Sequence, residues 1–332
     1  MNLYLILIAF IFIYIFITGF HDEGNLIATI ISSRSMSIRS AFITASLAQF
    51  IGTATLSTTV ASTISRDVLR LNYLNINRDN LYIMIFTGLL GAVIWNLITW
   101  YFGMPSSSSH ALVGGMIGPF IAQYGLKSVN VFGILLKVII PLFLSPILGF
   151  FIGYLVMHVT SNFLRAAGPR VNTVLKKLQY ITLLVLNAGQ GANDAQKGMG
   201  LISIALMGGG ISQSFMLPHW VKILSAVMIS SGLFFGGLRM IKSVGTRIYR
   251  VKPFHSFNAQ ISSLFIVITA AVFGLPTSGT QIINSSVLGV GAKERPTAVR
   301  WQFAKGMFTA WIITIPASFA LSSLIFIIVK SI

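Results

Sequence analysis

The sequence predicts an all-α, polytopic membrane protein with about ten membrane segments arranged as two inverted repeats. Hydrophobic residues make up 55% of the 332 residues, charged residues only 9%, and the mean hydropathy is +0.84. Long apolar runs recur along the whole chain, and two unrelated short patterns each occur twice at nearly the same separation. The first two observations indicate a membrane protein, and the third indicates internal duplication.

About ten apolar segments are expected, each long enough to cross or enter a bilayer. In the first half they fall at residues 3–31, 40–63, 81–102, 105–124 and 131–157. In the second half they fall at residues 178–206, 219–240, 260–273, 276–291 and 303–329. Because 105–124 and 276–291 are short and rich in glycine, each is expected to form a re-entrant hairpin or a broken helix.

A basic linker at 158–177 separates the first transmembrane repeat, 1–157, from the second, 178–332. The linker contains no acid, and its cations are Arg165, Arg170, Lys176 and Lys177. The positive-inside rule therefore places the linker in the cytoplasm. An odd number of crossings in each half then puts both termini outside and gives the halves opposite orientations, as an inverted repeat requires.

The net charge of +17 does not indicate a nucleic-acid partner. The Lys and Arg residues lie in short loops between apolar runs, which is the distribution that membrane orientation produces. The chain contains no cysteine, which excludes disulfides, thiolate chemistry and cysteine metal sites. No nucleic acid, metal site or cofactor is expected.

The duplication is visible in two pairs of motifs. Gly19–Asn25 resembles Gly191–Lys197, and Asp22 and Asp194 are 172 positions apart (194 − 22). The segment from Gly103 to Ser109 resembles the segment from Gly274 to Thr280, with its prolines 171 positions apart (276 − 105). Two different matches in one register predict two repeats, with the functional site at their interface.

Half of the acidic residues lie in the first pair of motifs. The chain has only 6 Asp and Glu, and Asp22, Glu23 and Asp194 are three of them. A charged side chain at the centre of a membrane helix costs about 2.5–3.5 kcal/mol, so Asp22 and Asp194 are expected to bind an ion or relay a proton. The alternative is an Asp that caps a restarting helix. Glu23 has Ala195 opposite it and is expected to face water at the helix end.

The neighbours of the two aspartates differ between the motifs. His21, whose ordinary pKa is about 6.5, could relay a proton, or it could be a plain hydrogen-bonded histidine. It matches Asn193, whereas Asn25 matches Lys197. An amide oxygen can bind Na⁺, but an ammonium cannot. Lys197 must pair with an acid, as in a structural ion pair with Asp194, or with an anionic substrate.

The second pair of motifs predicts an anion site. Serines follow Pro105, and Thr277, Ser278 and Thr280 follow Pro276. A helix that begins after proline offers free N–H groups and the positive end of its dipole, and the hydroxyls add donors. Ser and Thr also cap helices without binding a ligand. Two such segments in register could hold a tetrahedral oxyanion from both sides. A hydrolase built on His110 or on the two aspartates is a remote alternative from another class.

At these residues the chain resembles the inorganic phosphate transporter family. Phe20–Thr29 resembles the first family signature, and Gly191–Gly200 resembles the second in its bacterial proton-coupled form. The Pro-Ser and Pro-Thr segments also match, so the resemblance covers both halves. It implies import of inorganic phosphate by cation symport and alternating access, in the plasma membrane of a bacterium, with a homodimer as the expected assembly.

The resemblance also implies residue roles. The cation or proton side comprises Asp22, Asn25, Asn193 and Asp194, to which His21 is added. The phosphate side comprises Ser106, Ser107, Thr277 and Ser278, to which Lys197 is added. Sodium-coupled members carry Asn in both signatures, so Lys197 favours H⁺ coupling. Na⁺ coupling and sulfate transport remain the alternatives within the family.

Overall fold

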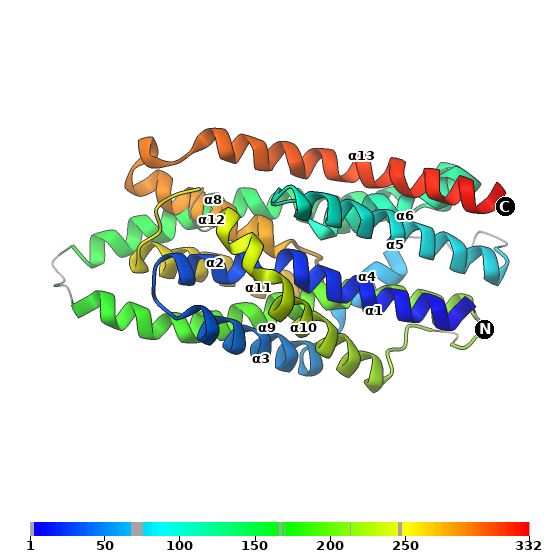
Figure 1. Ribbon diagram of the computed structural model, residues 1–332, viewed down its shortest axis with the longest axis horizontal. Helices are drawn as coiled ribbons and strands as arrows, with labels where there is room; N and C mark the ends of the chain where they lie inside the picture. Colours follow the sequence, from blue (N-terminus) through cyan, green and yellow to red (C-terminus); the bar gives the residue numbers. More distant parts are fainter. Residues whose placement is uncertain are drawn as a thin grey trace.

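The computed structural model describes residues 3–67, 76–165, 168, 170–212, 214–244 and 248–331. Every regular element in these ranges is a helix, which confirms the predicted all-α class. The helices run along the long axis of the molecule and pack side by side (Figure 1). Both chain ends lie at one end of the bundle, and the last residues of α8 (Ile140–Phe163) and the first residues of α9 (Arg170–Gly208) lie at the other.

The helices follow the apolar runs of the sequence. The first half contains α1 (Leu3–Asp22), α2 (Gly24–Ser32), α3 (Ile38–Thr55), α4 (Thr59–Asp67), α5 (Arg78–Tyr101), α6 (Ser108–Tyr124), α7 (Val131–Ile134) and α8, which continues α7 through the π-helical turn Leu135–Ile139. The second half contains α9, α10 (His219–Val244), α11 (Pro253–Phe273), α12 (Gly279–Glu294) and α13 (Trp301–Ser331).

Six helical stretches in the described part of the chain are long and apolar enough to cross a membrane. They are Leu3–Ser32, Arg78–Tyr101, Val131–Phe163, His219–Gly236, Pro253–Phe273 and Trp301–Ser331. The other expected segments fold as α3 with α4, α6, α9 and α12, which are shorter or more polar. α6 and α12 are buried along most of their length, so they need no lipid-compatible surface.

The predicted linker at 158–177 is largely helical. α8 continues to Phe163 and α9 begins at Arg170, so the connection between them is much shorter than expected. The helix breakers of this region, Gly168 and Pro169, are adjacent in the sequence, and its other residues can extend the two helices. Residues 166, 167 and 169 of the predicted linker lie outside the described residues.

The two halves interlock instead of forming separate domains. α13 packs on α5 and α6, whereas α8 packs on α11 and α12, and the pairs α1–α10 and α3–α9 also join the halves. At the α1–α10 crossing, a Cβ on Gly19 would lie 2.2 Å from the carbonyl oxygen of Ile229, and one on Gly232 would lie 2.1 Å from that of Phe16. Glycine at both positions therefore allows the two backbones to touch.

Two helix–loop–helix units place the Pro motifs in the interior. Gly103 (φ 63°) follows α5 and Gly274 (φ 66°) follows α11, both in the left-handed region that favours glycine. Pro105 and Pro276 follow, and α6 and α12 begin directly after the hydroxyl residues. The expected break after each proline is therefore present as a loop that leads into a buried helix.

Candidate functional site

Four segments of the chain meet in the buried interior: the α1–α2 junction, the middle of α9, and the N-terminal ends of α6 and α12. The two N-terminal ends are in contact, because the Ser109 hydroxyl donates a hydrogen bond of 3.2 Å to the Thr277 carbonyl oxygen. Helix N-termini carry unpaired N–H groups and a positive dipole end. Their meeting in a low-dielectric interior favours negative charge there.

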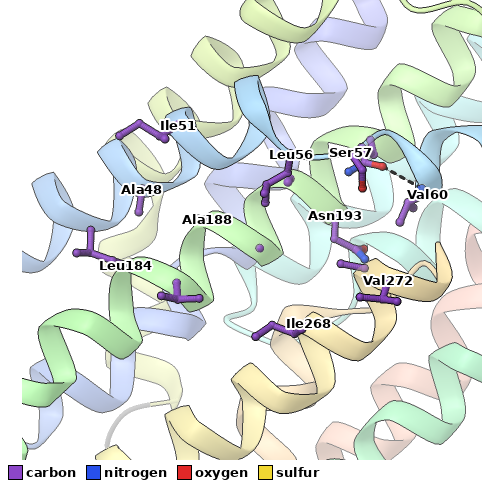
Figure 2. A pocket seen from close by; sticks show the side chains of 15 residues that line it. Ala48, Ile51, Leu56, Ser57, Val60, Leu184, Ala188, Asn193, Ile268 and Val272 are labelled. Carbon is purple, nitrogen blue, oxygen red and sulfur yellow. Dashed lines mark hydrogen bonds between the residues drawn. The ribbon is translucent and has the colours of Figure 1, made fainter.

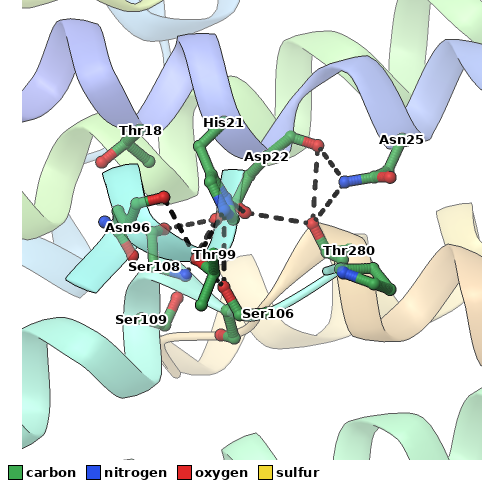
Figure 3. A network of polar contacts seen from close by, with 12 residues as sticks. Thr18, His21, Asp22, Asn25, Asn96, Thr99, Ser106, Ser108, Ser109 and Thr280 are labelled. Carbon is green, nitrogen blue, oxygen red and sulfur yellow. Dashed lines mark hydrogen bonds and ion pairs between the residues drawn. The ribbon is translucent and has the colours of Figure 1, made fainter. Parts of the chain in front are cut away.

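Asp22 binds the N-terminal end of α6. Its carboxylate accepts hydrogen bonds from the Ser108 hydroxyl and, at 3.2 Å, from the Ser108 backbone N–H (Figure 3). It also accepts from the Thr280 hydroxyl of α12 at 3.2 Å. Asp22 thus caps a helix of its own half while contacting the other half.

His21 extends this network toward α5. Its Nδ1 lies 2.6 Å from Asp22 Oδ1, and its Nε2 lies 3.2 Å from the Thr99 hydroxyl oxygen (Figure 3). Ser106 Oγ lies 3.4 Å from the same Nε2 and donates to Thr99 Oγ1 at 2.7 Å. The imidazole therefore connects the Asp22 carboxylate to one of the predicted phosphate-side hydroxyls.

The second motif is not a helix break, so the alternative of an Asp that caps a restarting helix does not apply to Asp194. α1 ends at Asp22 and α2 begins at Gly24, but α9 runs without interruption through Asp194. The first motif has Gly24 where the second has Gln196, and glycine weakens a helix interior. In α9 an ion pair between Lys197 and Asp194, one turn apart, also supports the helix.

Lys197 joins the two Pro motifs. Its ammonium pairs with Asp194 and donates to Ser109 Oγ at 2.5 Å and to the Thr277 carbonyl oxygen at 2.6 Å. The residue is only 1% exposed. The second oxygen of Asp194 accepts a hydrogen bond of 3.0 Å from Gln190 Nε2. Lys197 is therefore a fixed positive charge held by oxygens of both halves.

The two predicted asparagines are used differently. Asn193 donates to the Leu275 carbonyl oxygen at 3.1 Å and accepts from the Thr277 N–H at 3.2 Å, so both ends of its amide hold the loop before α12. Asn25 donates to Thr280 Oγ1 at 2.9 Å, and its Oδ1 has no hydrogen-bond partner among the described residues. Of these two residues, Asn25 is thus the one whose amide oxygen is available to a ligand.

The four predicted phosphate-side hydroxyls also divide between the halves. Ser106 donates to Thr99, and Ser107 accepts the His110 N–H at 3.4 Å as the N-cap of α6. The hydroxyls of Thr277 and Ser278 are buried and have no partner within the described part of the chain. Buried hydroxyls are normally hydrogen-bonded, so this pair is free to receive an incoming group.

Glu23 does not face water, so that expectation is wrong. It is 1% exposed, and Gln49 Nε2 of α3 donates to its Oε2 at 2.5 Å. The turn between α1 and α2 directs the side chain inward, where α3 covers it. Its Oε1 has no partner among the described residues. Sequence comparison of the halves missed this residue because Ala195 stands opposite it.

Several contacting residues were not among those given a role from the sequence. Ser108, Ser109 and Thr280 bind Asp22 or Lys197, although the Pro-Ser and Pro-Thr runs that contain them did signal the region. Thr99 and Gln190 had no distinguishing pattern. A short polar residue in the middle of an apolar helix is the one signal that could have found them.

A largely apolar hollow of about 520 Å³ lies beside the site, between α3, α9 and α11. Figure 2 shows Leu184, Ile268 and Val272 around it, with Asn193 at one edge. Its lining suits apolar groups and not a charged oxyanion. Asn193 belongs to this lining, whereas the polar contacts of Asp194 and Lys197 involve none of its residues.

The profile of a family described as "Phosphate transporter family" matches the chain twice, at residues 18–168 and 164–322. The "Probable low-affinity inorganic phosphate transporter" of Bacillus subtilis (strain 168) is 37% identical over 319 residues, which cover 96% of this chain and 94% of that protein. The protein of the same description from Rhizobium meliloti (strain 1021) is 35% identical over 320 residues, covering 96% and 94%.

A solved structure described as "The sodium-dependent phosphate transporter" has the same fold. Its TM-score against this chain is 0.90, at 22% identity, over 100% of both chains. The fold and the buried polar site thus define a multi-pass membrane transport protein, and these relatives are transporters, not enzymes. The chain belongs to the phosphate transporter family, whose named substrate is inorganic phosphate.

Proposed function

We propose that this chain imports inorganic phosphate together with protons, by alternating access at the interface of two repeats. The observation that carries the proposal is the position of Lys197. Its ammonium is buried among oxygens of Asp194, Ser109 and Thr277, where a mobile cation would otherwise be needed. A covalently attached cation cannot be exchanged with the medium, so the ion that is transported must bind elsewhere or be a proton.

The phosphate is expected to bind where the N-terminal ends of α6 and α12 meet. Thr277 and Ser278 supply free hydroxyl donors, and Lys197 supplies the positive charge. Ser106 already donates to Thr99, so it reaches the phosphate only when that contact opens, whereas Ser107 accepts the His110 N–H and keeps its own O–H donor. Donation from helix N-termini, hydroxyls and an ammonium is the usual chemistry of oxyanion binding in proteins.

The balance of charge favours proton coupling. Asp22, Glu23 and Asp194 are buried close to one ammonium, that of Lys197. A phosphate ion adds negative charge to a site that already contains more carboxyl groups than cations. Protonation of Asp22 or Asp194 on loading would offset that charge, and loss of the proton on the other side would favour release. His21 lies beside Asp22 and is a candidate path for that proton.

The architecture that we propose is two inverted repeats, 1–157 and 178–332, with about ten membrane segments. The family profile matches twice, and the two halves exchange equivalent partners, α6 with α13 and α12 with α8. Both termini are proposed to lie outside and the linker at 158–177 in the cytoplasm of a bacterium. The family resemblance also implies a homodimer. Single cysteines introduced at the termini and in the linker test this topology by labelling from either side of the membrane, because the chain has no cysteine of its own.

Uptake of labelled phosphate into proteoliposomes tests the function directly. A pH gradient and a Na⁺ gradient are imposed separately, with the internal and external buffers otherwise matched. Accumulation on the pH gradient alone is the expected result. Accumulation only on the Na⁺ gradient would keep phosphate import but overturn proton coupling and the argument from Lys197.

Sulfate is the alternative substrate, because hydroxyl and N–H donors bind either tetrahedral anion. A protonated phosphate also donates a hydrogen bond, which sulfate cannot do, and Asp22 and Asp194 place carboxylate acceptors beside the α6 and α12 ends. Phosphate is therefore expected to win a competition assay. Uptake of labelled sulfate that excess phosphate does not reduce would contradict this assignment.

A further inference from the structure

Four cations surround a second hollow, whose lining contains none of the candidate site residues. It has a volume of about 550 Å³ and lies where the end of α2, residues 250–253 and the start of α13 meet, with Arg34, Arg250, Lys252 and Arg300 in its lining. No acidic residue belongs to this lining, and none of the four forms an ion pair with another described residue. Like charges at such proximity repel, so the hollow favours an anion.

The conformation of Arg34 supports a role for its side chain. Arg34 has φ 55° and is the one non-glycine residue with positive φ in the described ranges. Arg34 directly follows Ser33, the C-cap residue of α2. The next residue, Ser35, donates its backbone N–H to the Ile30 carbonyl oxygen at 3.0 Å. This left-handed position normally holds glycine. An arginine at a position that disfavours it indicates that the guanidinium itself is used.

Arg300 also lines an apolar hollow on the outside of the bundle. This hollow has a volume of about 740 Å³ and lies between the α5–α6 loop and the first turns of α13, with Phe102, Met104, Phe303 and Met307 in its lining. Phe102 is 67% exposed and Trp301 is 44% exposed, so this hollow is open to the surroundings of the protein. A basic hollow and an apolar hollow therefore share one residue.

We propose that the two hollows together bind one anionic phospholipid. Its phosphate would lie among Arg34, Arg250, Lys252 and Arg300, and one acyl chain would lie along the apolar hollow of α13. Arginine binds phosphate oxygens in pairs through its planar fork, and basic pockets between membrane helices suit lipid head groups. Trp301, which follows Arg300 and lines the apolar hollow, has the amphipathic character of an interfacial residue.

A phospholipid has a head group that matches the basic hollow and an acyl chain that matches the apolar hollow, whereas free inorganic phosphate matches only the basic hollow. A phosphate ion would pair with the cations but would leave the apolar lining of the second hollow without a ligand. The same lining includes Pro105, whose carbonyl oxygen accepts a hydrogen bond of 2.9 Å from Trp311 Nε1. Ser106 of the transport site follows directly, so a bound acyl chain would contact the loop that leads into α6.

Lipid retention tests the proposal without any assumption about transport. The full chain is reconstituted in equal amounts of phosphatidylglycerol and phosphatidylcholine and extracted in a mild detergent. Native mass spectrometry then identifies the lipids that remain bound. Phosphatidylglycerol is expected to be retained in preference, and Arg300→Gln is expected to weaken its binding about fivefold. Lys305→Gln is the matched control, because Lys305 is an exposed cation on the same helix that lines neither hollow.

A second variant separates the acyl chain from the head group. Gly306 lines the apolar hollow, and a Cβ there would meet no atom within 4 Å, so Gly306→Phe is the variant chosen to occupy the hollow. It is expected to weaken long-chain phosphatidylglycerol more than glycerol phosphate. If its melting temperature shows misfolding, Gly306→Leu replaces it.

Three results would overturn the lipid assignment. Equal retention of phosphatidylcholine would reduce the site to a nonspecific apolar surface. An equal loss with Lys305→Gln would reduce it to general surface charge. Displacement of phosphatidylglycerol by millimolar inorganic phosphate, together with no effect of Gly306→Phe, would make the basic hollow a phosphate site instead.

Discussion

The two buried aspartates occupy corresponding positions in the sequence but different surroundings in the structure. Asp22 ends a broken helix, binds the N-terminal end of α6 and lies beside His21. Asp194 lies within an unbroken helix and pairs with Lys197. The two positions correspond in the sequence, and a few different neighbours make one of them a candidate for exchange and the other a fixed ion pair.

The largest effect is expected from Lys197→Ala, which would remove the difference between the two aspartates. Loss of one partner of a buried ion pair typically costs about 3–5 kcal/mol in the free energy of unfolding. Na⁺ is expected to restore part of this stability and to become necessary for uptake, because it can bind the oxygens of Asp194, Ser109 and Thr277. Thermal unfolding and phosphate uptake are measured with and without Na⁺.

Lys330→Ala is the control for that variant, because Lys330 is an exposed cation near the end of α13. It is expected to leave both measurements unchanged. Uptake by Lys197→Ala that is unchanged and independent of Na⁺ would rule out the idea that the ammonium stands in for a cation.

Asp22→Asn comes next and tests the exchangeable side of the comparison. The amide of asparagine cannot take up a proton. It also replaces the charged acceptor of the two hydrogen bonds from Ser108 by a neutral one, and a hydrogen bond to a charged group contributes about 1.5–3 kcal/mol. Uptake driven by a pH gradient is expected to fall roughly 10- to 100-fold. Phosphate exchange at equal pH on both sides shows whether binding survives. Full concentrative uptake would disprove a coupling role, and Asp79→Asn, at an exposed position, is the control.

The hydroxyls give a smaller and sharper contrast between the halves. Thr277→Val removes a hydroxyl that has no partner among the described residues, so stability is expected to hold while phosphate affinity falls about fivefold. Ser107→Ala removes the N-cap of α6 and is expected to cost about 1 kcal/mol of stability, with a smaller effect on affinity. Melting temperature and the KM for uptake distinguish the two. Equal KM values in the two variants would argue against the second half as the main phosphate contact.

The smallest effect is expected from His21→Asn, which gives the first motif the residue of the second. An asparagine can keep one hydrogen bond to its neighbours but cannot carry a proton at neutral pH. Uptake on a pH gradient is expected to fall about two- to threefold, which corresponds to roughly 0.5 kcal/mol. The pH profile of uptake is the diagnostic measurement. A profile identical to that of the wild type would remove His21 from the proton path.

The sequence determined the class of the protein and drew attention to the region of its candidate site. Apolar runs require helices in a membrane, because backbone groups must be hydrogen-bonded within each segment. The rarity of acids made Asp22 and Asp194 visible, and the repeated prolines made the ends of α6 and α12 visible. These signals are local, so one chain was enough to read them.

The tertiary structure alone decided how the site is used. The contacts of Asp22 with Ser108 of α6 and Thr280 of α12 join residues that lie far apart in the sequence. The burial of Glu23 depends on Gln49 of another helix. α6 and α12 are shorter than a bilayer is thick and are stable because their neighbours cover them. Long-range packing and shared hydrogen bonds set these features, and no local pattern encodes them.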